Sequence, residues 1–202
     1  MVESLLSIAV RLFIAILLIL WIMMYLFQEK MLFIRTHTDQ YFLKIIREKF
    51  PNAELWVDTR NHVRLHGWFR NASGLEKAPT IIYFGGNAED ISEQIFEFEP
   101  LKGWAVLLVN YRGYGLSQGS PSQENLFNDA LSIYDHISRR EDVDASRIVA
   151  MGRSLGSGVA VHLASQRPLA GVILVSPYDS IRNVAQKIYP VRADQPVAEA
   201  SV

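Results

Sequence analysis

The alternation of apolar runs with helical stretches in the second half of the chain is the feature that most restricts its fold. Continuous apolar runs are typical of strands that are buried on both faces of a parallel sheet. Helices between such strands predict an α/β fold, with a mostly parallel twisted sheet covered by helices on both faces. The expected strands are residues 80–84, 104–110, 147–152 and 171–175, and the expected helices are 88–99, 123–139 and 154–166.

Two shorter strands precede this region. Residues 54–59 and 63–70 read as a hairpin that turns at Asn61-His62. Upstream, residues 39–50 place Phe42, Ile45 and other apolar side chains at helical spacing, and Pro51 ends the segment. This amphipathic helix would suit the membrane surface. It would equally suit packing on its own domain.

The N-terminal segment, residues 5–27, is apolar throughout except for Arg11. As a helix it would be about 34 Å long, and the hydrocarbon core of a bilayer is about 30 Å thick. A cleaved signal peptide needs a small-residue cleavage site, which the segment Trp21–Phe27 lacks. A buried soluble helix would have to be enclosed on every face. We therefore expect an uncleaved single-pass transmembrane anchor, followed by a juxtamembrane segment over residues 28–53.

Basic residues favour one orientation of this anchor. Lys30, Arg35, Lys44 and Arg47 follow the apolar segment, whereas Arg11 is the only basic side chain at its start. Positive charge accumulates on the cytoplasmic side of membrane helices. The catalytic domain is therefore expected to be cytoplasmic.

The candidate nucleophile is Ser154, within Gly152-Arg153-Ser154-Leu155-Gly156. This G-x-S-x-G directly follows an expected strand and opens an expected helix, which is the setting that the motif requires. The serine of such a turn needs small residues two positions before and after it, because the chain segments come very close together. A glycine-rich helix start without chemistry is the competing interpretation.

A second loop, Gly85-Gly86-Asn87-Ala88, follows the strand at 80–84. In a hydrolase of this fold, the equivalent loop gives one backbone N–H of an oxyanion hole, and the residue after the serine, here Leu155, gives the other. An ordinary strand-to-helix loop would also use glycine and asparagine. The loop alone therefore leaves both readings open.

Taken together, these segments resemble the α/β-hydrolase superfamily. The motifs that carry the resemblance are G-G-N-A from Gly85, N-Y-R-G-Y-G-x-S-x-G from Asn110, G-R-S-L-G-S-G from Gly152 and S-P-Y-D-S from Ser176. The chain is most similar to a membrane-anchored branch of serine-peptidase-like hydrolases with one N-terminal helix, over about residues 54–190. Relatives usually carry histidine where this chain has Gly85.

The resemblance implies a sheet of eight strands, a Ser-His-Asp triad and hydrolysis through an acyl-enzyme. It assigns Ser154 as the nucleophile and Asn87 and Leu155 as the oxyanion-hole residues, with Gly86 shaping the loop. It makes the loop from Arg112 to Gly115 structural.

The chain departs from this pattern after the serine. The triad order of the fold is serine, acid, histidine, but the only later histidine is His162, two helical turns on and about 12 Å away by helical rise. The later carboxylates are Asp179, Asp194 and Glu199. We expect Asp179 to cap a helix that begins at Ile181. We also expect a tail at 191–202 and a C-terminally truncated hydrolase domain over 54–190, incomplete after about strand six.

Composition narrows the function further. The net charge of −1 gives no basic patch for nucleic acid, and the absence of cysteine excludes disulfides and thiolate chemistry. No cofactor or metal is implied. The sequence thus predicts a membrane-anchored serine hydrolase of an ester, thioester or amide in a small or lipid-like acyl substrate, impaired because the triad acid and base are missing. The alternative is a non-catalytic scaffold or binding fragment of the same fold.

Overall fold

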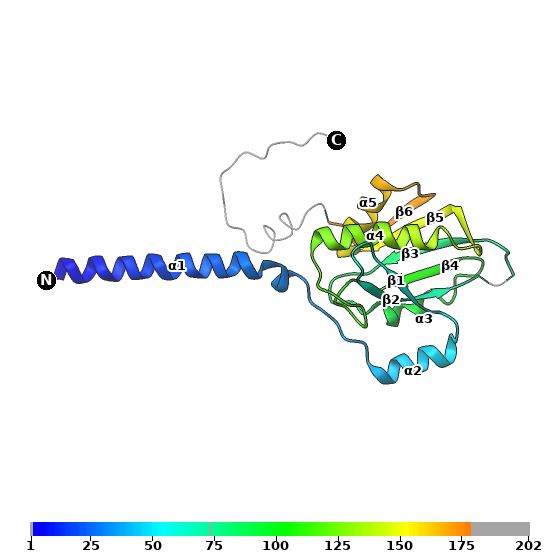
Figure 1. Cartoon of the computed structure of the whole chain (residues 1–202), viewed down its shortest axis with the longest axis horizontal. Coiled ribbons are helices and arrows are strands. Elements are labelled where there is room, and N and C mark those ends of the chain that lie inside the picture. The colour runs from blue at the N-terminus through cyan, green and yellow to red at the C-terminus, as the bar shows by residue number, and fades with distance from the viewer. Residues whose placement is uncertain (1, 73, 179–202) are drawn as a thin grey trace.

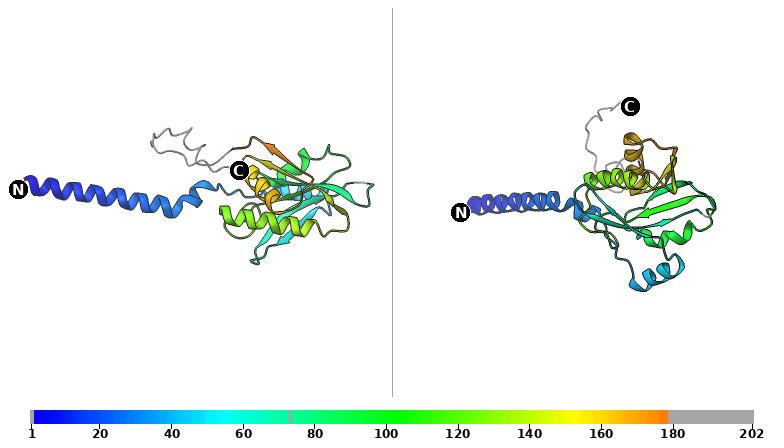
Figure 2. Two further views of the ribbon diagram at one scale, coloured as in Figure 1. Left: turned by 90° about the horizontal axis from the view of Figure 1, so that it is seen from above. Right: turned by 45° about the vertical axis from the view of Figure 1, so that its right-hand side comes forward.

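A long N-terminal helix projects from a domain built on one sheet (Figure 1). The computed structural model describes residues 2–72 and 74–178. Helix α1 (Val2–Leu32) leaves one end of the domain as a straight rod, and the views in Figure 2 agree on this arrangement. Its segment Ser7–Phe27 is long and apolar enough to cross a membrane.

Within the described residues, the sheet has six strands in the order β1-β2-β4-β3-β5-β6. Strand β3 pairs in parallel with β4 and β5, and β6 pairs in parallel with β5, whereas β2 is antiparallel to β1 and β4. The predicted mixed, mostly parallel α/β sheet and the N-terminal hairpin are confirmed. The strands are β1 (Glu54–Asp58), β2 (Arg64–Arg70), β3 (Ala78–Phe84), β4 (Ala105–Val109), β5 (Val143–Arg153) and β6 (Gly171–Val175).

Helices cover both faces of the sheet, and the central strands β3 and β4 are therefore buried at every position. In β3, Ile82 and Phe84 pack in one cluster and Tyr83 packs in the other. The first cluster lies under α4 (Gln123–Ile137) and α5 (Leu155–Gln166). The second lies under α2 (Gln40–Lys49), the 3₁₀ helix η1 (Ile91–Glu93) and the short α3 (Gln94–Glu97).

Helix α2 packs on its own domain. Its Leu43 and Ile46 are buried in the second cluster beside Trp68 of β2. Of the two settings that its amphipathic sequence allows, the structure has the domain-packed one. Residues 39–50 are thus part of the domain core.

The prediction of a helix at 88–99 was wrong, and α1 extends past the expected membrane segment. The helix expected at 88–99 is only η1 and α3, because Ala88 has a left-handed φ of 59° and Asp90 caps a new start by accepting from Ser92 N–H. Helix α1 continues beyond Phe27 to Leu32. Gln, Glu and Lys are good helix formers, so the end of an apolar run need not end the helix.

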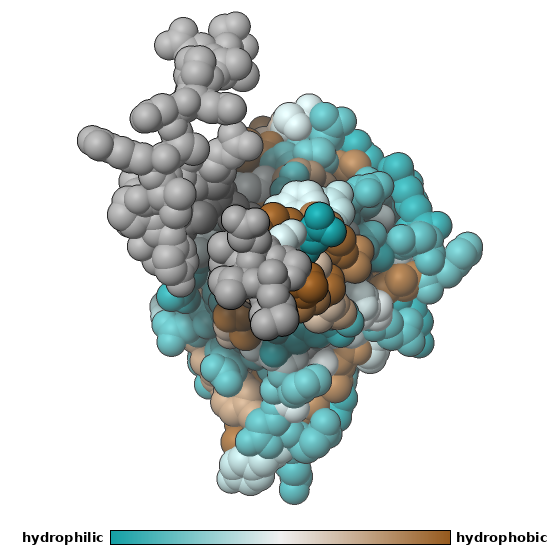
Figure 3. Space-filling view, turned by 90° about the vertical axis from the view of Figure 1, so that its left-hand side faces the viewer, coloured by the Kyte–Doolittle hydropathy of each residue, from teal (hydrophilic) through white to brown (hydrophobic). Residues whose placement is uncertain are grey.

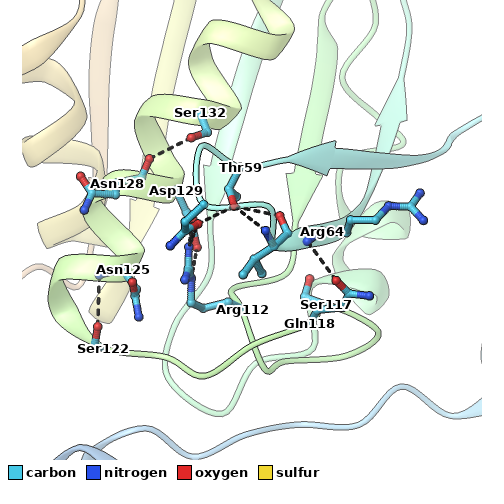
Figure 4. Close-up of polar contacts among 12 residues, drawn as sticks. Thr59, Arg64, Arg112, Ser117, Gln118, Ser122, Asn125, Asn128, Asp129 and Ser132 are labelled. Atoms are coloured by element: carbon cyan, nitrogen blue, oxygen red, sulfur yellow. Dashed lines mark hydrogen bonds and ion pairs between the residues drawn. The ribbon is translucent and has the colours of Figure 1, made fainter.

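The loop between β4 and α4 is held by buried charge (Figure 4). Arg112 donates from Nε to Asp129 Oδ2 at 2.7 Å and also pairs through Nη2, and both side chains are buried. Burial raises the pKa of Asp129 despite this pairing. At the start of α4, Ser122 Oγ accepts from Asn125 N–H. These contacts fit the structural role that the family resemblance implies for this loop.

Candidate active site

Ser154 lies at the junction of β5 and α5, at the carboxyl end of the sheet. Its backbone angles are φ 48° and ψ −114°, and its side chain is exposed. A non-glycine residue in this region is strained, at a cost of order 1–3 kcal/mol. The turn therefore has the strand-to-helix geometry in which a nucleophilic serine is presented to solvent.

The two flanking glycines are required by crowding. A Cβ on Gly156 would overlap the carbonyl oxygen of Phe84 at the end of β3. A Cβ on Gly152 would overlap the carbonyl oxygen of Gly156. The turn can fold close to the neighbouring strand only when both positions lack side chains.

The loop after β3 lies beside Ser154, because β3 and β5 are parallel neighbours and their carboxyl ends meet. A Cβ placed on Gly86 would be 3.7 Å from Ser154 Cβ. The backbone N–H of Gly86 donates to Glu89 Oε2 at 2.7 Å. The backbone N–H groups of Asn87 and Leu155 donate to no acceptor within residues 2–72 and 74–178.

The side chain of Asn87 is bonded to other parts of the chain. Its Nδ2 donates to the carbonyl of Leu32 at 2.7 Å, and its Oδ1 accepts from Ile34 N–H at 3.0 Å. The same oxygen accepts from Tyr114 Oη at 2.8 Å. Burial raises the pKa of Tyr114 to about 12, so that its hydroxyl remains a donor at neutral pH.

Glu89 is the charged group nearest to this loop. Its Oε1 accepts from Tyr83 Oη at 2.8 Å, while its Oε2 holds Gly86 and lies 3.7 Å from Arg153 Nη1. Burial, followed by the bond to Glu89, raises the pKa of Tyr83, so Tyr83 stays a neutral donor. The carboxylate thus fixes the turn that precedes Asn87.

Two hollows meet at Arg153. One, of about 410 Å³, has Ser154, Asn87 and Glu89 in its wall. The other, of about 590 Å³, lies at the ends of β3, β5 and β6 and includes Tyr83 and Met151. The first is polar and carries the candidate nucleophile, and the second offers adjacent space for part of a substrate.

No histidine lines either of these hollows, although all five histidines of the chain lie in the described residues. The ring of His162 stacks on Phe127 with centroids 4.2 Å apart. His66 is buried in β2 between two tryptophans. Asp179, Asp194 and Glu199 lie outside the described residues, as do the helix expected to begin at Ile181 and the tail expected at 191–202. Within the described ranges there is no cluster of three metal-ligating side chains.

Sequence reasoning found the serine and both loops but not the polar contacts around them. Glu89 and Tyr83 carry no motif, and their bonds to the loop depend on how β3 ends. The contact of Asn87 with Leu32 and Ile34 joins residues more than fifty positions apart. No local pattern could have indicated it.

Comparisons with known proteins place the chain in a family. The family model described as serine aminopeptidase, S33, matches residues 89–195, which is more than half of the chain. The alpha/beta hydrolase domain-containing protein WAV2 of Arabidopsis thaliana is 34% identical over 173 residues, covering 81% of this chain and 56% of that protein. The lysophosphatidylserine lipase ABHD12 of Gallus gallus is 34% identical over 143 residues, covering 66% of this chain and 36% of the lipase.

Among solved structures, an alpha-beta hydrolase from Vibrio vulnificus superimposes with a TM-score of 0.63 at 22% identity. The match covers 81% of this chain and 59% of that one. This likeness concerns the fold alone. The chain spans about half the length of the curated relatives that it matches.

Proposed function

The chain belongs to the serine aminopeptidase S33 family of the α/β-hydrolase superfamily, and we propose that it is a membrane-anchored serine hydrolase with Ser154 as its nucleophile. In this proposal, Ser154 Oγ attacks the carbonyl of an ester, thioester or amide. The leaving group departs with a proton, and water then hydrolyses the acyl-enzyme. The N–H groups of Asn87 and Leu155 stabilise the negative oxygen of each tetrahedral intermediate.

The observation that carries the proposal is the strained, exposed position of Ser154 beside the two open N–H groups. Removing one such donor from an oxyanion hole typically costs a factor of about 10²–10³ in kcat. Because the donors here are backbone groups, the side chain found at position 85 matters little for this role. Gly85 is thus compatible with hydrolysis although relatives usually carry histidine there.

The proposed substrate is a small or lipid-like acyl compound. The lysophosphatidylserine lipase among the relatives acts on a lipid by its name, and α1 supplies a segment of membrane-spanning length. We further propose that α1 is a retained anchor and that the domain faces the cytoplasm, because basic residues follow the apolar segment.

The second candidate is a non-catalytic scaffold that retains the fold for binding. The observation that favours it is the lack of a histidine at the hollow beside Ser154. Without a base, a serine site keeps only the effect of the oxyanion hole and of binding, on the order of 10³–10⁴-fold over water. We therefore propose that this chain of 202 residues hydrolyses its substrate slowly.

Release of nitrophenol from a short-chain nitrophenyl ester, measured on the full chain in detergent micelles, separates the two candidates. If the chain is a hydrolase, we expect it to release nitrophenol slowly but faster than micelles alone. We expect Ser154→Ala to abolish this excess release. The matched control is Ser165→Ala, whose serine is exposed at the far end of the same helix. Equal release from wild type and Ser154→Ala would favour the scaffold.

A further inference from the structure

The membrane helix is bonded directly to the candidate oxyanion loop. Asn87 bridges the carbonyl of Leu32, which is the last residue of α1, and the N–H of Ile34. Thr36 makes two further contacts that extend this attachment: its carbonyl accepts from Gly115 N–H at 2.9 Å, and its side-chain Oγ1 donates to the Glu89 carbonyl at 3.5 Å. We call residues 32–36, held in this way, the tether clamp.

The clamp leaves little distance between the candidate site and a bilayer. The membrane-length segment ends at Phe27, and α1 remains helical to Leu32. At 1.5 Å per residue, Leu32 lies about 7.5 Å beyond that end. The headgroup layer on each side of the hydrocarbon core is about 5–8 Å thick. With Phe27 at the edge of the hydrocarbon core, Asn87 would lie near the outer edge of the headgroups, and a Cβ placed on the adjacent Gly86 would be 3.7 Å from Ser154 Cβ.

The side chains around the clamp suit this position. Met31 and Ile34 are 68% and 58% exposed although both are apolar. Arg35 extends over Gly113, and Lys30 lies 5.3 Å from the ring of Phe27. Apolar groups with flanking cations are what a lipid–water interface favours. On the side from which α1 projects, hydrophobic and hydrophilic residues are intermixed around the helix (Figure 3).

We propose that the tether clamp holds the candidate site at the lipid surface, so that its acyl substrate is an amphiphile taken from the membrane that anchors the chain. The statement about the substrate rests on the proposed hydrolase function, whereas the statement about position does not. A ten-residue flexible linker would allow the site to move some 15 Å or more from the surface. The bonds of Asn87 remove that freedom.

Asn87 also links the position of the proposed oxyanion donor to the tether clamp. Its backbone N–H is the proposed oxyanion donor, and its carboxamide holds α1. The orientation of that N–H is therefore fixed partly by the membrane segment. Release of the tether should loosen the donor and the membrane position together.

The position can be measured without turnover, because the chain has no cysteine and a single introduced thiol is unique. Ser154→Cys and Ala145→Cys are each labelled with a nitroxide in the full chain, in phosphatidylcholine vesicles. Both positions are exposed. Ala145 lies in the irregular part of β5 before Ile148, and the regular run from Ile148 to Ser154 spans about 20 Å at 3.3 Å per residue. Collision rates with oxygen, which concentrates in lipid, and with a water-soluble nickel complex are then compared.

We expect the ratio of oxygen to nickel collisions to be higher at position 154 than at 145. Asn87→Ala, or Ile34→Pro, which removes the N–H that Asn87 accepts, should abolish the difference. An unchanged mobility of the label at 145 shows that the domain remains folded in these variants. Equal ratios of oxygen to nickel collisions at positions 154 and 145, in chains without a substitution in the clamp, would overturn the proposed position.

The source of the substrate is tested by mass spectrometry of the acyl group on Ser154. Nitrophenyl palmitate in the same vesicles as the protein should acylate Ser154 faster than palmitate ester held in separate vesicles. Equal rates would overturn the membrane source. If no ester acylates Ser154, including a soluble one, the hydrolase function is overturned. The ratios of oxygen to nickel collisions at the nitroxide labels still test the position in that case.

Discussion

At the scale of single residues, backbone strain gathers at the candidate site. Four non-glycine residues in the described part of the chain have positive φ, and two of them, Ala88 and Ser154, lie in the wall of the same hollow. Such strain persists only where surrounding contacts impose it, and it is often part of a functional site. Here the contacts are the close approach of Gly156 to the end of β3 and the bond from Gly86 to Glu89.

The close approach of Gly156 gives the first prediction. Gly156→Ala places a Cβ against a backbone carbonyl that cannot move independently, so we expect a loss of at least about 2 kcal/mol in the free energy of unfolding. Gly171→Ala is the matched control, because a Cβ there meets nothing within 4 Å. Urea unfolding followed by circular dichroism measures both. A Gly156→Ala protein as stable as the control would contradict the packing described for the turn.

At the scale of elements, the sequence predicted the strands well and the short helices poorly. Strands β3 and β4 were predictable because apolar residues occupy both of their buried faces, and β6 has the same apolar pattern although its side chains are exposed. The break before η1 was not, since it depends on the left-handed Ala88 and on Glu89 bonding back to Gly86. The helical periodicity of residues 88–99 indicates which side chains are buried. It does not reveal that the Glu89 carboxylate accepts a hydrogen bond from the backbone N–H of Gly86.

The hairpin of β1 and β2 gives a prediction on pH. His66 is fully buried between Trp56 and Trp68, with Nε2 3.0 Å from Glu54 Oε1. Burial lowers the pKa of His66 although Glu54 opposes this effect. Hydrogen bonds from Arg47 lower the pKa of Glu54.

The lowered pKa values of His66 and Glu54 both make the folded state less stable as the pH falls. A lowered folded pKa means that the unfolded chain binds protons more readily, so stability is present above the unfolded pKa and is lost as pH falls. For His66 the loss begins near pH 6.5 and reaches at most about 2 kcal/mol at pH 5. We expect His66→Gln to lose less stability than wild type between pH 7.5 and 5, whereas His37→Gln, at an exposed position, should behave as wild type. An identical pH dependence in His66→Gln would exclude His66 as the cause.

At the scale of the whole molecule, an apolar helix is joined to the sheet of an α/β-hydrolase domain through contacts at the candidate site. The sequence predicted both parts, because membrane-length hydrophobicity and the serine turn are local patterns. It could not predict that Asn87 would bind the end of α1. That contact joins distant residues and uses a backbone carbonyl and a backbone N–H, which carry no sequence signal.

A single charge introduced into the apolar segment tests whether that segment is retained as a membrane anchor. Leu18→Lys places an ammonium group near the middle of Ser7–Phe27, and a charge there costs about 2.5–3.5 kcal/mol on insertion. We expect wild type to stay in the membrane fraction after carbonate washing and Leu18→Lys to be partly released. Met31→Lys lies beyond the segment and should stay bound. Recovery of wild type as a soluble species that begins near residue 28 would mean that the segment is cleaved.

The central claim is that Ser154 is the residue that becomes acylated. Its most direct test is intact-mass and peptide mass spectrometry after prolonged exposure of the full chain to nitrophenyl acetate. A site without a histidine base should deacylate slowly as well, so the acyl group should accumulate. The account predicts one acetyl group on Ser154, and none at that peptide in Ser154→Ala. Acetyl groups spread over lysines and other serines, with Ser154 unmodified, would contradict it.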